Sequence, residues 1–396
     1  MPEQNKQPES VSGQTKINNI PADSNPFRLS RIVIRGFKSI QACDVTLKNL
    51  TVMIGPNGAG KSNFIGFFRL IQQMLQGRLQ VYTGKQGGPD ALLHFGRKKT
   101  ETLQAELFFE NSGYKFSLEP TQDNRMMFAD ESLWDEGSGD KLLGSGHFES
   151  KLKEQGDPAW QHAIPDAKNW CLYHFHDTSE SALVKQRHGI HDNLNLKPDA
   201  RNLAAFLFRL QKNFPDNYAR IVRLIQIIAP FFGEFLLHPD TDNPDYIELQ
   251  WMEKGEETPF KAHQLSDGTL RFICLATVLN QPEECLPKII LIDEPELGLH
   301  PRAIGFLASM LRSVSRRRQV IVSTHSVTLV NGFSIDDLIV MDRKEGVSFF
   351  QSHSEQSFEN WLKEYTVGDL WEKNVLGGWI DDHHITLSNK QTALGA

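Results

Sequence analysis

Four consecutive aliphatic residues at positions 289–292 form a hydrophobic run that ends in two acids, Asp293 and Glu294. Such a run is typical of a central strand of a parallel sheet, because both faces of that strand are buried. The carboxyl end of such a strand is where open α/β sheets bind their ligands. Apolar runs and alternating patterns elsewhere predict further strands over 31–40, 45–54, 103–109, 170–177, 246–251, 320–322 and 338–341.

Apolar residues also recur at helical spacing, which predicts helices over 63–75, 202–210, 218–229, 269–279 and 302–314. Strands mixed with helices in this way indicate an α/β fold. The glycine-rich stretch 77–90 is expected to be a loop and 114–128 a hairpin. Residues 130–166 are polar and are expected to form an inserted surface. The first 26 residues, rich in Gln, Asn, Ser and Pro, are expected to be a disordered tail.

Composition narrows the class of protein. The 396 residues suffice for one large domain with an insertion or for two domains, and 39% hydrophobic residues are typical of a water-soluble protein. A net charge of −7 excludes a surface that binds polyanions as a whole. DNA contacts would need local patches such as 97–99 or 316–318, although such short basic runs are more often solvated. Scattered cysteines, with no signal peptide or membrane-spanning run, favour a cytoplasmic location.

The segment 55–62 reads Gly-Pro-Asn-Gly-Ala-Gly-Lys-Ser, with a predicted strand before it and a predicted helix after it. This is the context that the phosphate-binding pattern G-x-x-x-x-G-K-[ST] requires. Its glycines let backbone N–H groups surround a phosphate chain, and the helix N-terminus adds a favourable dipole. Lys61 is expected to reach the β- and γ-phosphates of ATP, and Ser62 to bind Mg²⁺. The predicted nucleotide-binding residues here are Asn57, Gly58, Gly60, Lys61, Ser62 and Asn63.

The two acids that follow residues 289–292 complement this phosphate-binding loop. An acid pair can be an ordinary solvated strand end. Here, however, the loop supplies Lys61, whose charge can pair with the acids, and Ser62, which can share a Mg²⁺ ion with them. The sequence therefore predicts that Asp293 binds Mg²⁺ and that Glu294 orients and deprotonates water. The implied chemistry is hydrolysis of ATP, with ATP and Mg²⁺ as ligands.

Two further polar segments lie at the ends of predicted elements. Ser266, followed by Asp267 and Gly268, can cap a helix whose N-terminus suits a phosphate group. His325 follows the predicted strand 320–322, where it could sense a γ-phosphate or simply end the strand.

A third segment places His174, His176 and Asp177 close together, with both histidines on one face of a predicted strand. These side chains could bind a metal. The alternative is a structural or nucleotide-proximal strand whose histidines are hydrogen-bonded, and the absence of a downstream His/Asp cluster with metallohydrolase spacing favours it.

With these segments placed, the chain resembles the RecF/SMC/OLD branch of ABC-type ATPases, and within it a bacterial family of predicted ATPases. The resemblance rests on 173–178, 265–272, 293–301 and 369–378, and it covers about 27–379. It implies an α/β fold: an ABC-type P-loop ATPase head with a mixed sheet and an inserted α-helical and β region, without a long coiled coil or a TOPRIM nuclease domain. The implied division is a tail at 1–26, an N-lobe at 27–110, an insertion at 111–260, a C-lobe at 261–345, and a helical cap and tail at 346–396.

The resemblance also implies a dimer, or a higher oligomer, that sandwiches nucleotide between subunits. Ser266, Asp267 and Gly268 of one subunit would contact the γ-phosphate held by the other, where Glu294 and His325 are catalytic. Many ATPases of this type place a Gln near Mg²⁺, and no clear one is present here. His94 is a candidate substitute, although a turn histidine is the simpler interpretation.

Relatives in this branch include DNA-repair proteins and ATPase subunits of anti-phage defence systems that act with a separate nuclease or toxin. The leading hypothesis is an ATPase that dimerises around ATP and serves as the sensor or regulatory subunit of such a complex, controlling a partner effector. The alternatives are a RecF-like DNA-binding ATPase in DNA repair and a scaffold that binds ATP with little turnover. A transporter subunit is a weaker interpretation, and no membrane partner is expected.

Overall fold

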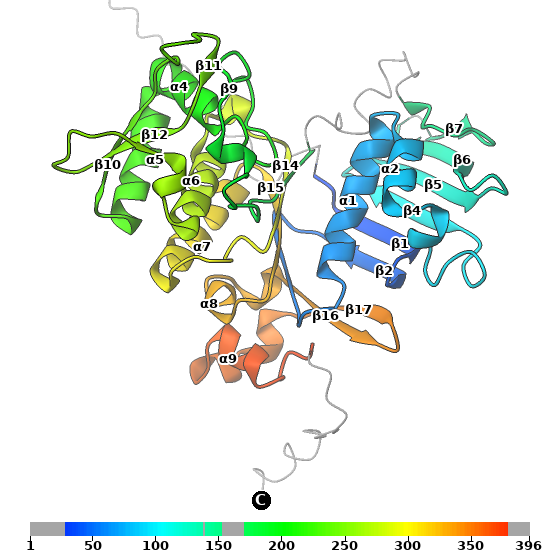
Figure 1. Cartoon of the computed structure of the whole chain (residues 1–396). Coiled ribbons are helices and arrows are strands. Elements are labelled where there is room, and N and C mark those ends of the chain that lie inside the picture. Colours follow the sequence, from blue (N-terminus) through cyan, green and yellow to red (C-terminus); the bar gives the residue numbers. More distant parts are fainter. Residues whose placement is uncertain (1–27, 138, 153–169, 379–396) are drawn as a thin grey trace, which may run out of the picture.

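The computed structural model describes residues 28–137, 139–152 and 170–378. A helical layer and an antiparallel sheet lie on opposite sides of a central sheet, as Figure 1 shows. The predicted tail at 1–26, most of the predicted surface beyond 152 and the last dozen residues lie outside the described residues.

The central sheet has the strand order β17-β16-β3-β15-β14-β8. Five of its strands are parallel neighbours, and β17 pairs antiparallel with β16, so the sheet is mixed as predicted. The strands are β3 (Leu50–Ile54), β8 (Trp170–Tyr173), β14 (Ile289–Asp293), β15 (Gln319–Thr324), β16 (Leu338–Lys344) and β17 (Val347–Ser352).

Both faces of the central sheet are covered, which explains its continuous apolar runs. Successive side chains point to opposite faces, so Ile290 and Ile292 pack in one core and Ile289 and Leu291 in the other. The first core lies against the helices α4 (Leu203–Asn213), α5 (Pro215–Ile228), α6 (Asp267–Asn280) and α7 (Pro301–Ser315). The second lies against α1 (Lys61–Leu75).

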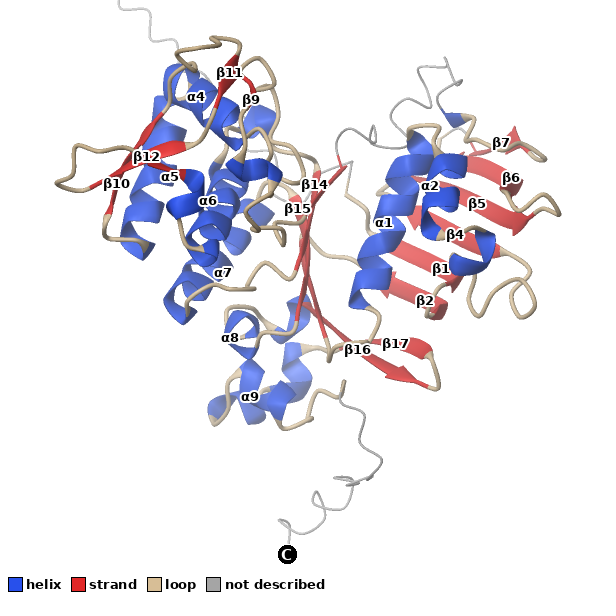
Figure 2. Ribbon diagram, viewed as in Figure 1, coloured by secondary structure: helices blue, strands red, loops and turns tan. Residues whose placement is uncertain are grey.

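The antiparallel sheet covers the outer side of α1 (Figure 2). Its order is β2-β1-β4-β5-β6-β7. The strands are β1 (Arg31–Phe37), β2 (Ile40–Thr46), β4 (Leu103–Phe108), β5 (Ser112–Pro120), β6 (Met126–Asp135) and β7 (Gly139–Gly144). The predicted boundary at 110 falls between β4 and β5 of this one sheet.

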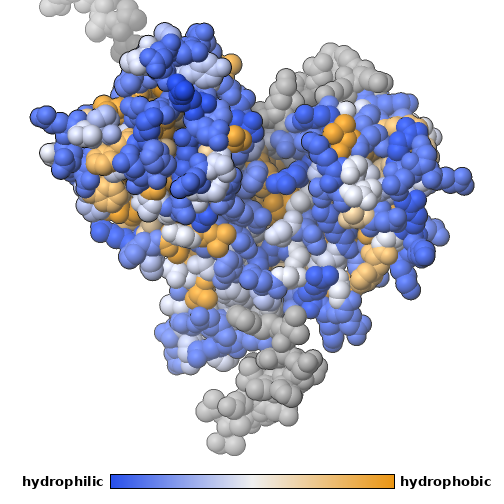
Figure 3. Space-filling model, viewed as in Figure 1, coloured by the Kyte–Doolittle hydropathy of each residue, from blue (hydrophilic) through white to orange (hydrophobic). Residues whose placement is uncertain are grey.

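Smaller elements complete the molecule. A three-stranded sheet of β10 (Phe232–Leu236), β12 (Gln250–Glu253) and β13 (Phe260–Lys261) lies in the helical part, with the pair β9 (His188–Gly189) and β11 (Tyr246–Ile247). The C-terminal region contains α8 (Val327–Val330) and α9 (Val367–Glu372). No helix in the described ranges is long and apolar enough to cross a membrane. The face shown in Figure 3 is mostly hydrophilic, with hydrophobic residues in small scattered patches.

Two segments differ from the sequence prediction. The stretch 77–90, expected to be a loop, contains helix α2 (Leu79–Gln86), in which Leu79 and Tyr82 are buried. Part of 130–166, expected to be an inserted surface, forms the end of β6 and all of β7. In both cases tertiary contacts order a polar stretch that shows no strong local periodicity.

Candidate functional site

The P-loop, residues 55–60, joins β3 to α1 and is held against the β16–β17 hairpin. Gly58 and Gly60 have φ angles of 85° and 108°, which only glycine adopts readily. A Cβ atom at Gly60 would collide with Ser348 Oγ, and one at Gly55 with the Met341 carbonyl oxygen. Ser348 also donates to the Ala59 carbonyl at 2.8 Å. The glycines are thus required both for the turn and for its close approach to this hairpin.

Lys61 is buried at the start of α1, with 4% of its surface exposed. Its ammonium group donates to the carbonyl oxygens of Gly55 at 2.7 Å and Pro56 at 3.1 Å. Burial lowers the pKa of Lys61, and the charges of Glu294, Glu296 and Asp293 act in the opposite direction. The charges of the acids at the end of β14 and just after it therefore act on the lysine of the P-loop.

The two predicted acids lie at the carboxyl edge of the parallel strands. Asp293 pairs with Ser323 in the β14–β15 register, and the Ser323 hydroxyl donates to Asp293 Oδ1. Glu294 has a φ of 44°, a conformation that a residue other than glycine adopts at a cost and that is common at functional sites. Its carboxylate oxygen Oε1 lies 3.3 Å from His325 Nδ1. The structure thus brings Asp293, Glu294 and His325 together.

Glu296 is an additional residue of this edge that the sequence analysis did not single out. Its Oε1 accepts hydrogen bonds from the Thr324 hydroxyl at 2.6 Å and from the His325 backbone N–H at 3.1 Å. The same oxygen lies 3.7 Å from His325 Nδ1. Only 5% of Glu296 is exposed, and burial raises the pKa of its carboxyl group. The sequence feature that could have identified Glu296 is its position two residues after Glu294, within the segment 293–301.

Ser266, Asp267 and Gly268 form the exposed N-terminus of α6. Ser266 caps this helix by accepting from the Thr269 N–H at 3.2 Å. A Cβ atom at Gly268 would collide with the Gly298 carbonyl oxygen, so the helix end lies directly against the loop after β14. Within the described ranges, no hydrogen bond or ion pair joins Ser266 or Asp267 to the P-loop of the same chain.

Arg271, one turn further along α6, connects this helix to the sheet edge where Asp293 and Glu294 lie. Its guanidinium group donates to the Leu297 carbonyl at 2.8 Å and to the Phe175 carbonyl at 3.0 Å. It also donates to the His176 carbonyl at 2.8 Å. One side chain therefore ties α6 to the loop after β14 and to the segment after β8.

The segment after β8 lies beside Asp293 because β8 pairs in parallel with β14. His176 Nε2 donates to the Asp293 carbonyl at 2.9 Å. Burial is the largest cause that lowers the pKa of His174. In the part of the chain that the structure describes, no group of three or more His, Cys, Asp or Glu residues could hold a metal. The structure thus places His176 beside Asp293, and the role of His174, His176 and Asp177 near a nucleotide stays a prediction.

The remaining candidates are engaged elsewhere. His94 is buried, and its Nδ1 lies 2.6 Å from the Lys38 carbonyl, so its ring holds the turn between β1 and β2. In the basic run 316–318, Arg317 and Arg318 both form ion pairs with Glu283, at 3.0 and 2.5 Å. In the run 97–99, Arg97 pairs with Asp90 at 3.0 Å. These pairs reduce the free positive charge of both patches.

Comparison with known proteins places this geometry in context. A family model described as "AAA domain, putative AbiEii toxin, Type IV TA system" matches residues 50–331. A putative ABC transporter ATP-binding protein of Methanosarcina acetivorans is 33% identical over 107 residues, which are 26% of this chain and 37% of that relative. The OLD nuclease of Thermus scotoductus is 22% identical over 385 residues, which cover 87% of this chain and 68% of the nuclease.

A solved SMC head bound to the C-winged helix domain of ScpA has the same fold. Its TM-score is 0.58 at 16% identity, and the match covers 84% of this chain and 99% of the SMC head. The α/β fold class predicted from the sequence is thereby confirmed. The chain spans less than half the length of the first of these curated relatives.

Proposed function

The chain belongs to the family of AAA domains described as putative AbiEii toxins of type IV TA systems, and we propose that it hydrolyses ATP between two of its copies to control a partner effector. Its architecture is that of a RecF/SMC/OLD-like ABC-type ATPase. The observation that carries the catalytic part is the 3.3 Å contact between Glu294 Oε1 and His325 Nδ1, at the sheet edge where Asp293 ends β14. A buried lysine facing several acids is suited to a ligand that brings phosphate charge and a divalent cation.

The donor set fits Mg²⁺. Ser62 is exposed at the start of α1, and within the described ranges no hydrogen bond reaches Asp293 Oδ2. Magnesium in nucleotide sites is usually held by one or two protein oxygens together with phosphate oxygens and water. Ser62 and Asp293 would hold the ion, which when bound neutralises charge on the phosphate oxygens.

The protein groups divide the remaining work between them. Lys61 and the backbone N–H groups of the P-loop bind and orient the phosphates. The Glu294 carboxylate accepts a proton from the attacking water, and His325, 3.3 Å from it, orients that carboxylate. Glu296 fixes the His325 backbone through its hydrogen bond. Ser266 at the exposed end of α6 completes the site of a second copy.

The regulatory role rests on the relatives. The description of the matching family mentions a putative toxin of a type IV TA system. Two curated relatives are OLD nucleases, from Thermus scotoductus and from Escherichia phage P2. ATP-dependent pairing of two chains would change the surface offered to a nuclease or toxin partner, as in an anti-phage defence complex. The DNA-repair alternative has less support, because Arg317 and Arg318 are paired with Glu283.

Replacement of Glu294 by Gln tests the catalytic role. The variant keeps the size of the side chain and removes the base, so phosphate release should fall by roughly 10²–10⁴-fold. ATP binding should persist, and the ATP-bound dimer should accumulate on size exclusion. Glu359→Gln, an exposed acid in the C-terminal region, is the matched control and should behave as wild type.

Equal phosphate release by wild type and Glu294→Gln would exclude Glu294 as the base. A wild-type protein that binds ATP and releases no phosphate, with or without DNA, would favour the scaffold alternative instead.

A further inference from the structure

A hollow of about 580 Å³ lies beside the outer edge of the P-loop. Asn63, in the first turn of α1, lines it, and so does Arg343, whose guanidinium group donates to the Gly58 carbonyl at 3.4 Å. The turn between β1 and β2, with Lys38 and Ser39, forms another wall. The hollow therefore begins where the phosphate-binding loop ends, and its volume suits a nucleoside.

Phe95 is the exposed aromatic residue in the wall of this hollow. It exposes 59% of its surface, whereas just over half of the phenylalanines in the described ranges are buried. Its φ angle is 56°, which bulky side chains seldom adopt. An aromatic ring held open to solvent in an unfavourable backbone conformation, next to a predicted phosphate site, indicates a ligand contact rather than core packing.

The backbone around Phe95 is firmly held. The His94 N–H donates to the Gly36 carbonyl at 3.0 Å, and His94 Nδ1 donates to the Lys38 carbonyl at 2.6 Å. A Cβ atom at Gly346, in the turn of the β16–β17 hairpin, would lie 2.7 Å from Phe95 Cζ. The ring is thus supported by a neighbouring turn on one side while more than half of its surface stays open.

We infer that Phe95 is the platform on which the purine base of the nucleotide stacks. This inference rests on the proposed function, because it requires the triphosphate to be bound at Lys61. The flat face of a base on the open phenylalanine ring provides affinity with little reading of the base edge. A purine is favoured over a pyrimidine because its larger ring system covers more of the phenylalanine.

The charges around the hollow are compatible with a nucleotide. Lys38 and Arg343 are cations in its wall. Asp90, the one acid in the wall among the described residues, forms an ion pair with Arg97 at 3.0 Å, so its charge is largely offset. A ligand that carries negative phosphates therefore meets little repulsion there.

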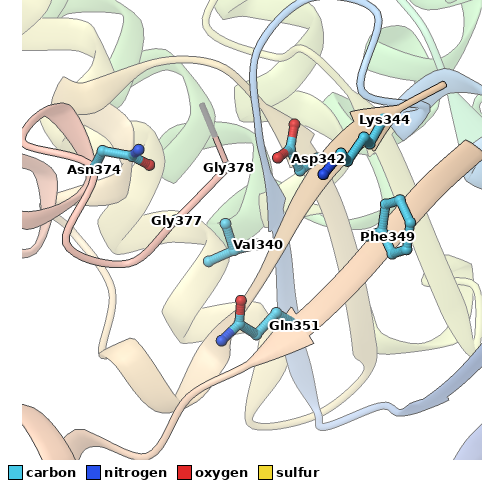
Figure 4. Close-up of a pocket in the computed structure, with 8 residues that line it drawn as sticks. All are labelled: Val340, Asp342, Lys344, Phe349, Gln351, Asn374, Gly377 and Gly378. Carbon is cyan, nitrogen blue, oxygen red and sulfur yellow. The ribbon is translucent and has the colours of Figure 1, made fainter. Parts of the chain in front are cut away.

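A second hollow, of about 380 Å³, lies on the other face of the β16–β17 hairpin (Figure 4). Phe349 lines it and is 53% exposed. Side chains alternate along β17, and Ser348 is the one that contacts the P-loop, so Phe349 points away from it. Phe349 is therefore a matched control of the same residue type, similar exposure and the same neighbourhood.

The test is binding of ATP and of inorganic tripolyphosphate, each with Mg²⁺, to the full chain and to Phe95→Ala, Phe95→Trp, Phe349→Ala and Lys61→Ala. Phe95→Ala should weaken ATP binding by about 5- to 150-fold, the equivalent of the roughly 1–3 kcal/mol of a base–aromatic stack. It should leave tripolyphosphate binding unchanged. Phe95→Trp and Phe349→Ala should keep wild-type ATP affinity, and the loss for CTP should be smaller than for ATP.

The inference is overturned if Phe95→Ala binds ATP as tightly as Phe349→Ala does. It is also overturned if Phe95→Ala weakens ATP and tripolyphosphate equally, because the effect would then be structural. A wild-type chain whose ATP binding does not depend on Lys61 would overturn the proposed function, and this inference with it. The Lys61→Ala variant therefore separates the two failures.

Discussion

Among single residues, Glu296 is a carboxyl group that the fold keeps away from water at the edge of the site. Burial raises its pKa above the usual value of 4.5, so the folded state holds a proton that the unfolded chain releases at lower pH. The contribution of Glu296 to stability is therefore fully present below about 4.5 and is lost as the pH rises through the raised folded-state pKa. Neutral Gln at this position has no such dependence.

Comparison with Glu296→Gln measures this effect. We expect the free energy of unfolding of wild type, relative to that of the variant, to decrease as the pH is raised from acid to neutral. Urea unfolding at a series of pH values provides the measurement, and subtraction cancels the titration of all other groups. A difference that stays constant with pH, or one that grows in favour of wild type, would contradict the raised pKa.

The residues that sequence alone identified are those with a local signature. Lys61 and Ser62 follow a glycine pattern, and Asp293 and Glu294 end an aliphatic run, so their chemistry could be read without knowing the fold. The contact between His176 and the Asp293 carbonyl could not be predicted in the same way. It depends on β8 being the neighbour of β14, and sequence does not reveal which strands pair.

Among the elements, helix α2 lies in the stretch 77–90, which the sequence predicted to be a loop, and its first hydrogen bonds explain the difference. The carboxylate of Glu149 accepts from the backbone N–H groups of Leu79 at 2.7 Å and Gln80 at 3.0 Å. The acceptor for the first N–H groups of this helix therefore lies 70 residues later in the sequence, after strand β7. No pattern within 77–90 could signal it.

Removal of that carboxylate should destabilise the fold. Glu149→Ala is expected to lower the free energy of unfolding by roughly 1–2 kcal/mol, because two helix N–H groups lose their acceptor. Chemical unfolding of both proteins gives the value. Glu149→Gln keeps an acceptor oxygen and should lose less; an equal loss in the two variants would mean that the hydrogen bonds are not the cause.

The packing of helix α6 against the loop after β14 gives a second prediction at this scale. An alanine at Gly268 collides with the Gly298 carbonyl oxygen, so the helix end and this loop must separate. We expect Gly268→Ala to lower ATP hydrolysis by about 100-fold, the scale of a misplaced catalytic group. ATP affinity should remain, because the P-loop lies elsewhere in the chain.

The control for this variant is Gly305→Ala, within α7, where an added Cβ meets no atom within 4 Å. Alanine there should raise the free energy of unfolding by about 0.5–1 kcal/mol and leave hydrolysis unchanged. If Gly268→Ala hydrolyses ATP as fast as Gly305→Ala, the close contact does not position the site.

In the whole molecule, the central sheet is built from segments that are far apart in the sequence. Its strands come from 50–54, 170–173, 289–293 and three later segments, so the predicted lobes interleave. The fold class could be predicted because apolar runs indicated buried strands and helical periodicity lay between them. The boundaries at 110 and 345 did not, because one falls inside the antiparallel sheet and the other in the β16–β17 turn.

This arrangement leaves the exposed N-terminus of α6 without a contact to the P-loop of its own chain in the described ranges, and a second copy would supply the missing half of the site. Mixing two inactive variants tests this. Lys61→Ala disables the P-loop half and Ser266→Arg the α6 half, so each protein alone should be inactive. A mixed dimer has one site with both defects and one site with none. Random mixing should therefore restore about a quarter of wild-type phosphate release, because half of the dimers are mixed and each has one of two sites intact. A site completed within one chain predicts no recovery at any ratio, and that result would refute the shared site.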